Sequence, residues 1–558
     1  MHTVQDHSLS SNGDVAEGKH AIARKTGHRS FDRRPRTSSA DSRSKLRVAV
    51  ALPLLLVAAG PTPLSAKSFH RTRLAVPSSA ATQSSGQHHR KTKAGNEAAV
   101  TAGNAAETAD LGYKYERGQG VPQDYQKARQ LYAKAAAAGS ATAMNRLGTL
   151  YYEGSGVPRD YRKARWWYQQ AAVRGDVAAM ANLGNLYYRG HGVPQSYAKA
   201  KTWYQKSADK GNAAAMIQVG FLYYQGHGVP QDYEQARQWY EKAAATGNSS
   251  ASANLGFLYD RGQGVPQDYQ KAQECYEKAA AAGNVTAMAN LGTLYDRGHG
   301  VAQDYPKAQA WYEKAAAAGS ASAMTKLGVL YERGLGVPQD YAKAIELYEK
   351  AAAAGNPTAM ISLAFLYYQG QAVPQDYLKA REWYEKAADT GQADAMNSLA
   401  VMFERGEGVP QDYQKAREWY EKAALAGNAG AMNSLGYLYY QGDGVSQDYA
   451  KARQWYEKAA AAGNTDAMTN LAYLYRKGQG APQDYPKAKE WYEKAAAAGA
   501  AEAMTGLGGL YARGQGVRQD EQEAKAWYEK AAAAGNVEAQ QRLEMLSGAQ
   551  ANSQTESH

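Results

Sequence analysis

Residues 284–319 read NVTAMANLGTLYDRGHGVAQDYPKAQAWYEKAAAAG, and this stretch decides the fold. Asn284 can cap a helix, because its side-chain oxygen can accept a hydrogen bond from an N–H group that the first turn leaves unpaired. Apolar residues then recur at spacings of three and four from Ala287 to Tyr295, which is the period of a helix with one apolar face. The glycines of the loop at 298–300 end this first helix.

A second helix follows the glycine-rich loop. Asp304 can cap it, and it runs through Trp311 and an alanine run to Gly319, where it stops. A single pair of helices of this kind cannot bury its own apolar face, so it must stack on neighbouring pairs. The stretch therefore predicts one unit of an all-α solenoid.

The same pattern recurs every 36 residues without insertion or deletion. Twelve units run from 104 to 535, and a thirteenth first helix at 536–548 caps the array before a disordered tail at 549–558. Ser, Asp or Asn fills the first cap in ten units, and Gln392 and Ala500 are the exceptions. The pentapeptide VPQDY ends at Tyr125, Tyr233, Tyr269, Tyr341, Tyr377 and Tyr413, with variants that end at Tyr161, Tyr197, Tyr305, Tyr449, Tyr485 and Glu521.

The residues before the array have a different composition. Residues 1–47 are polar and basic, without a hydrophobic period, and predict a disordered segment. Residues 48–66 contain a short apolar run after basic residues and end in small residues, which resembles a secretory signal peptide cleaved near Ala66. Residues 67–103 predict a flexible basic linker. This order favours an exported protein, periplasmic or secreted, and the alternative is an inner-membrane anchor formed by 48–66.

Charge and cysteine content exclude several classes of protein. Residues 1–100 hold 16 Lys and Arg against 6 Asp and Glu, whereas the rest of the chain holds 48 against 47. Because a nucleic-acid-binding body needs uncompensated Lys and Arg, we expect no nucleic-acid partner. The single cysteine excludes a disulfide framework and a metal site built from several thiolates.

The unit resembles a known repeat. Its pattern, A-x-A-M-x-x-L-G-x-L-Y-x-x-G-x-G-V-P-Q-D-Y-x-K-A-x-x-W-Y-E-K-A-A-x-x-G, is similar to the Sel1-like repeat, a relative of the tetratricopeptide repeat, and the similarity covers 104–548. The resemblance implies a right-handed α/α superhelix that serves as an adaptor for protein assemblies. Some exported members carry a cysteine pair in each repeat, and this chain departs from them because it has only Cys275.

Residues that could carry chemistry have simpler interpretations. His191, His227 and His299 share one loop position in different units, too far apart to share a metal, and we interpret them as loop filler. Cys275 stands where the other units hold Trp or Leu, which favours a small buried hydrophobe. The glutamates of the second helices recur in most units, which is typical of a solvated face. The sequence therefore predicts no catalytic residue, no cofactor and no metal site.

The units themselves show where a partner could bind. On the first helix the positions of residues 289, 293 and 296 vary within an otherwise uniform array, and their spacing puts them on one face. In related repeats this helix lines the concave surface, where aromatic side chains would anchor a peptide or protein. Packing of the same rings as core between adjacent helices is the second interpretation. The candidate partner-binding residues are Phe221, Tyr224, Phe257, Phe365, Tyr368, Tyr437, Tyr440 and Tyr473.

Three classes of function are consistent with these features. The first is a non-catalytic scaffold or adaptor in the bacterial cell envelope, which binds a protein or peptide along the concave face. The second is an envelope hydrolase or a protein that binds cell wall or β-lactams, by analogy with the cysteine-rich relatives. The third is a passive structural spacer.

Overall fold

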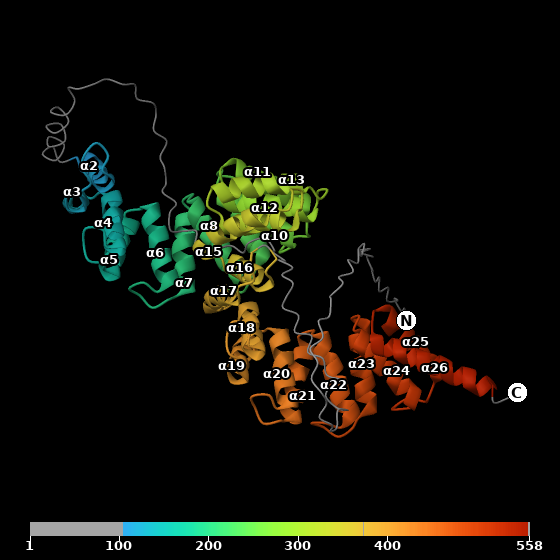
Figure 1. Ribbon diagram of the computed structural model, residues 1–558. Helices are drawn as coiled ribbons and strands as arrows, with labels where there is room; N and C mark the ends of the chain where they lie inside the picture. Colours follow the sequence, from blue (N-terminus) through green and yellow to red (C-terminus); the bar gives the residue numbers. More distant parts are fainter. Residues whose placement is uncertain (1–103, 372, 556–558) are drawn as a thin grey trace, which may run out of the picture. The chain divides into compact units, whose positions relative to one another are not determined.

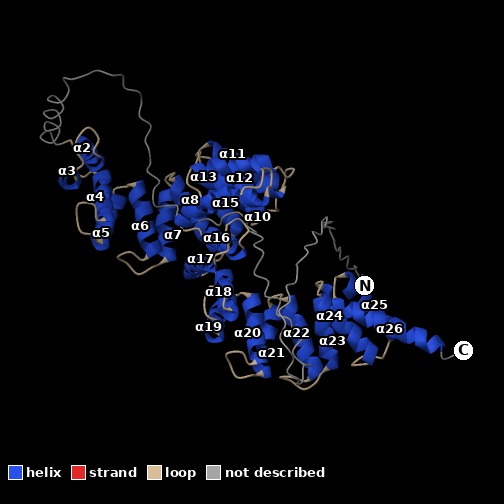
Figure 2. Ribbon diagram, viewed as in Figure 1, coloured by secondary structure: helices blue, strands red, loops and turns tan. Residues whose placement is uncertain are grey.

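The computed structural model describes residues 104–371 and 373–555, which form helices α2 to α26 in chain order (Figure 1). All regular elements in this part of the chain are helices (Figure 2). Each of the twelve units contains two helices, called the first and the second helix below. The all-α solenoid predicted from the period of 36 is confirmed.

The first helices are α2 Ala105–Arg117, α4 Ala141–Glu153, α6 Val177–Arg189, α8 Ala213–Gln225, α10 Ser249–Arg261, α12 Val285–Arg297, α14 Ala321–Arg333, α16 Pro357–Gln369, α18 Ala393–Arg405, α20 Ala429–Gln441, α22 Thr465–Lys477 and α24 Ala501–Arg513. The second helices are α3 Tyr125–Ala137, α5 Tyr161–Val173, α7 Tyr197–Ala208, α9 Tyr233–Ala244, α11 Tyr269–Ala281, α13 Tyr305–Ala317, α15 Tyr341–Ala353, α17 Tyr377–Asp389, α19 Tyr413–Leu425, α21 Tyr449–Ala461, α23 Tyr485–Ala497 and α25 Glu521–Ala533. The array ends with α26 Val537–Thr555.

The ends of the helices follow from local chemistry. The side chain of Asn284 accepts a hydrogen bond at the start of α12, and Asp304 does the same for α13. Gly298 ends α12 with a φ of 70°, a left-handed conformation that suits glycine. Gln392 and Ala500, the two exceptions in the sequence, form no side-chain cap. The expected helix boundaries of the unit are therefore confirmed.

These two uncapped helices give a stability prediction. Ala500→Ser is expected to stabilise α24 by about 1 kcal/mol, because the serine oxygen can accept an N–H group of the first turn. Hydrogen exchange of the amides of α24 would measure the change. Ser320→Ala, which removes an existing cap, is the matched control and is expected to destabilise α14 by a similar amount. Equal protection of α24 in the parent and in the Ala500→Ser variant would contradict the prediction.

A tyrosine of the second helix forms the centre of each unit. Tyr312 is fully buried, as are the equivalent tyrosines of most other units. A Cβ atom added to Gly292 would lie 2.5 Å from the Tyr312 ring, so this glycine of the first helix mainly makes room for the ring. Ala308, also fully buried, lets the two helices approach. Each unit thus has a small aromatic core, and the next unit covers its open side.

From the sequence we expect the capping helix to end at residue 548. Helix α26 instead continues to Thr555, because no proline follows residue 548 and residues such as Ala549 and Gln550 are good helix formers. The signal-peptide-like segment 48–66 and the other segments before 104 lie outside the described residues. Within the described ranges, no helix has the length and apolar character that crossing a membrane requires.

Candidate functional site

The candidate partner-binding residues lie on the first helices, at the junctions between successive units. Phe257, Tyr368 and Tyr440 are buried, with exposed fractions of 5%, 6% and 7%. The other candidates are all half-buried: Phe221, Tyr224, Phe365, Tyr437 and Tyr473. The rings therefore divide into a buried group, which packs within the junctions, and a half-buried group, part of which faces solvent.

Contacts between rings join neighbouring units. The Tyr224 ring lies 6.1 Å from the Phe257 ring of the next unit, with the planes nearly perpendicular. Tyr440 and Tyr473 form the same contact at 6.5 Å. Such edge-to-face pairs stabilise beyond the area that they bury. We call the positions of residues 289, 293 and 296 on the first helices the stripe. Rings of the stripe contribute to the packing between units, so the interpretation that they form core between adjacent helices describes part of their role.

At the position of residue 296, five units carry a carboxylate and five carry a tyrosine, and the two types have different partners. A carboxylate accepts a hydrogen bond from the buried tyrosine of its own unit, as in Tyr348 Oη to Glu332 Oε2 at 2.6 Å. A tyrosine can reach the loop of the following unit, as in Tyr368 Oη to Glu407 Oε2 at 2.5 Å. The other carboxylate pairs are Tyr132–Glu116, Tyr276–Asp260, Tyr312–Asp296 and Tyr420–Glu404.

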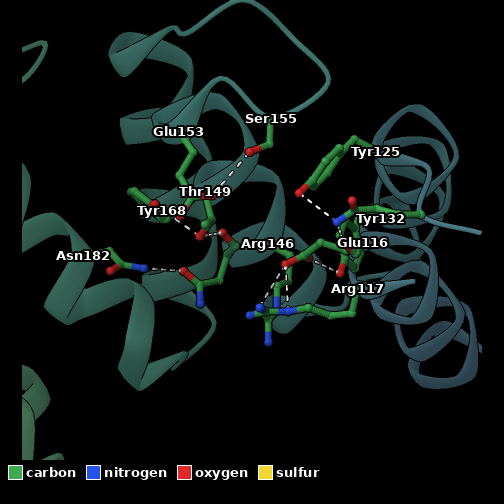
Figure 3. A network of polar contacts seen from close by, with 12 residues as sticks. Glu116, Arg117, Tyr125, Tyr132, Arg146, Thr149, Glu153, Ser155, Tyr168 and Asn182 are labelled. Atoms are coloured by element: carbon green, nitrogen blue, oxygen red, sulfur yellow. Dashed lines mark hydrogen bonds and ion pairs between the residues drawn. The ribbon is translucent and has the colours of Figure 1, made fainter. Parts of the chain in front are cut away.

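Figure 3 shows the network at the first junction. Tyr132 donates to Glu116 Oε2 at 2.6 Å, and Arg146 of the next unit lies 3.6 Å from the other oxygen of that carboxylate. Arg117 approaches the same carboxylate at 3.7 Å. The network satisfies a buried hydroxyl and links two units at once. In the next unit, the hydroxyl of Tyr168 donates a hydrogen bond to Thr149 Oγ1 instead, at 3.3 Å.

Lys326 occupies the place of Arg146 at a junction further along the array. It is buried, and its cation faces Asp296 of the preceding unit and the ring of Tyr312, 5.9 Å away. Burial and the nearby Arg297 lower the pKa of Lys326 to about 8, and the charge of Asp296 opposes this shift. Burial raises the pKa of Asp296, while Lys326 and the Tyr312 hydroxyl oppose that shift. The carboxylate of Asp296 therefore lies within a junction between units.

The loop histidines do more than fill the loop. The His191 ring stacks on the Tyr161 ring of the preceding unit at 4.6 Å, and its Nδ1 atom lies 3.2 Å from the Tyr152 hydroxyl. His227 stacks on Tyr197 at 4.5 Å in the same way. This contact between units was missed from the sequence, because the residues that stack here lie 30 positions apart and no local spacing indicates it.

The structure assigns no chemistry to the described residues. Cys275 is half-buried against the core of α8 to α10, and burial raises the pKa of its thiol, which disfavours the nucleophilic thiolate. Residues 104–371 and 373–555 contain no group of three or more His, Cys, Asp or Glu that could hold a metal ion. The carboxylates with raised pKa values at the position of residue 296 serve the packing of their units.

Comparison with known families identifies the repeat. The Sel1 repeat model matches twelve times in succession, at residues 108–140, 141–176, 177–212, 213–248, 249–284, 285–320, 321–356, 357–391, 393–428, 429–464, 465–499 and 501–536. The chain belongs to the Sel1 repeat family. Its fold is one that generally serves protein–protein interaction, and the members of this family are generally scaffolds without catalytic activity.

Several solved structures resemble this Sel1 repeat protein. One is c5321, a protective antigen in uropathogenic Escherichia coli strains with an SLR fold: it is 35% identical, the match covers 75% of this chain and 93% of c5321, and the TM-score is 0.47. A Sel1 repeat protein from Oxalobacter formigenes is 31% identical over 44% of this chain and 96% of its own, with a TM-score of 0.41. Cysteine rich protein B from Helicobacter pylori is 28% identical over 24% and 96%, with a TM-score of 0.20. No functionally curated protein matches the chain.

Proposed function

We propose that this Sel1 repeat protein is a non-catalytic adaptor of the bacterial cell envelope, which binds a protein or peptide along its first helices. The observation that carries the proposal is the contrast between the two helices of the unit. Seven of the twelve second helices contain the sequence Trp-Tyr-Glu-Lys-Ala-Ala unchanged, whereas the position of residue 293 holds Thr, Asn, Phe, Val, Tyr or Gly. Variation among apolar, aromatic and polar side chains on this face of the first helices is what recognition of an irregular partner requires.

Burial narrows the proposed contact surface. Phe221, Phe365, Tyr437 and Tyr473 are half-buried, so part of each ring can contact a partner while the rest holds the junction. A ring fixed in this way loses little conformational entropy on binding, which favours it as an anchor. The envelope location is supported by the apolar segment 48–66, whose flanking residues resemble a signal peptide.

A capture experiment tests the adaptor function. The full chain and the variant F221A/F365A/Y437A/Y473A would be used to capture proteins from envelope extract, with circular dichroism as a check of folding. We expect a discrete partner that the variant binds at least about tenfold more weakly, because buried aromatic anchors contribute most of the energy in such interfaces. The matched control is E277Q/E313Q/E349Q/E493Q, which changes exposed side chains of the second helices and should capture the partner as the parent does.

Other results of the capture experiment would place the contact surface elsewhere or contradict the adaptor function. A partner that the stripe variant retains and the control loses would place the contact surface on the second helices. If the parent and both variants capture nothing, the adaptor function is contradicted and the passive spacer gains support. An unfolded stripe variant is resolved by Thr substitution at the same four sites, because Thr149 and Thr293 already occupy this position in the chain.

A further inference from the structure

The array is nearly neutral as a whole, but its two ends differ in net charge. Residues 104–211, the first three units, contain 16 Lys and Arg against 8 Asp and Glu, a net charge of +8. Residues 212–558 contain 32 against 39, a net charge of −7. The first three units are therefore strongly basic, and the rest of the array is acidic.

The excess of basic residues is concentrated on the second helices. Helices α3, α5 and α7 contain nine Lys or Arg and no Asp or Glu, whereas each later second helix contains at least one Glu. One position of the unit accounts for most of this difference. Where the later units have the glutamate equivalent to Glu313, the first three have Ala133, Gln169 and Gln205.

In six of the nine later units this glutamate forms an ion pair with a cation one turn earlier. Arg453 Nη1 lies 2.7 Å from Glu457 Oε1, and Lys489 pairs with Glu493 at 2.7 Å. The equivalent cations in the first three units are Arg129, Arg165 and Lys201, for which no glutamate stands one turn later. Further exposed cations on these units are Arg162, Arg174 and Lys210, and none of the three forms an ion pair within the described part of the chain.

Large apolar side chains are exposed among these cations. Trp166 on α5 has an exposed fraction of 51%, and Val173 at the end of the same helix has 83%. A spacing of seven puts both on one side of α5, and Arg162, four residues before Trp166, lies on that side as well. The centroids of the Trp166 and Trp167 rings lie 4.6 Å apart, with the ring planes nearly perpendicular. Basic and apolar groups thus share one exposed surface.

We propose that the exposed sides of α3, α5 and α7 bind an anionic lipid bilayer, with Trp166 and Val173 at the water–lipid interface. Clustered Lys and Arg are attracted to the negative surface of such a bilayer, and Trp is enriched at the interface. Val173 favours lipid over a nucleic acid, because a phosphate backbone would pair with the cations and leave this side chain in water.

Restoring the missing glutamates tests this surface. The variant A133E/Q169E/Q205E gives the first three units the residue that the others carry, one turn after Arg129, Arg165 and Lys201, so the new side chains repeat pairs that the fold already contains. The full chain would be sedimented with vesicles of phosphatidylcholine alone and of phosphatidylcholine mixed with phosphatidylglycerol. We expect the variant to bind anionic vesicles at least about tenfold more weakly than the parent, because attraction scales with the number of cations at the surface.

Two further variants separate charge from apolar contact. The control A310E/Q414E/Q454E adds the same charge at exposed sites of later units, and we expect it to bind like the parent. The variant W166T/V173A uses residues that other units of this chain hold at these positions, and we expect weaker binding with an unchanged salt dependence.

Each other result would overturn the proposal. Equal losses in A133E/Q169E/Q205E and A310E/Q414E/Q454E would show a general effect of net charge. Undiminished binding of the first variant would assign the lipid contact to segments before residue 104. A parent that binds both kinds of vesicle equally, or that binds duplex DNA but no anionic vesicle, would show that these helices have another role.

Discussion

Tyr348→Phe is expected to destabilise its unit by about 2 kcal/mol, while Tyr240→Phe, the same change at the equivalent position, is expected to stabilise its unit by about 1 kcal/mol. The Tyr348 hydroxyl donates to the Glu332 carboxylate at 2.6 Å, where the tyrosine is fully buried and the glutamate is half-buried. Removing the hydroxyl leaves a carboxylate without this donor. The Tyr240 hydroxyl is fully buried and has no hydrogen-bond partner within the described residues, so its removal relieves a desolvation penalty.

The reason for the opposite signs lies in one side chain of the first helix. Tyr224 stands near Tyr240, at the position where the unit of Tyr348 has Glu332, and Tyr224 packs instead against Tyr233 and Phe257. Native-state hydrogen exchange of the amides in α9 and α15 would measure the change in local stability that each substitution causes. The method suits a repeat array, because its units can open separately. Tyr456, also buried without a partner in the described part of the chain, should follow Tyr240. The same sign at Tyr240 and Tyr348 would contradict this account.

The helices could be predicted from the sequence because their ends depend on neighbouring residues. Asn284, Asp304 and Gly298 act within one turn, and the apolar spacing of α12 is local as well. Even the exceptions, Gln392 and Ala500, were visible as missing caps. Twelve copies of one unit then made the solenoid the only way to bury the apolar faces.

The candidate site could be predicted only in part. The variable positions do lie on one face of the first helix, but the burial of each ring depends on side chains of adjacent units. Phe257 is buried and Phe221 is half-buried, although both occupy the same position in their units. Glu332 and Asp296 each accept a hydrogen bond from a tyrosine that lies sixteen residues later. Only the packed structure shows these pairings.

The titration of Lys326 gives the second large effect. In the folded protein its pKa is lowered to about 8, against an ordinary value of 10.5. Between these values the unfolded chain binds more protons than the folded protein, so the contribution of Lys326 to stability rises with pH. From pH ~8 to pH ~10, the free energy of unfolding of the parent should rise by about 2 kcal/mol relative to Lys326→Met.

Comparison of variants isolates this effect from other titrations. The groups that face Lys326 include Asp296, Arg297 and Tyr312, and all are retained in Lys326→Met, so their contributions largely cancel in the difference. Urea unfolding followed by circular dichroism at each pH would supply the difference. The matched control is Lys314→Met on the exposed face of α13, which should show no change with pH relative to the parent. A difference for Lys326→Met that stays constant or falls as pH rises would mean that the cation is solvated, and the junction between the sixth and seventh units would then be more open than its packing indicates.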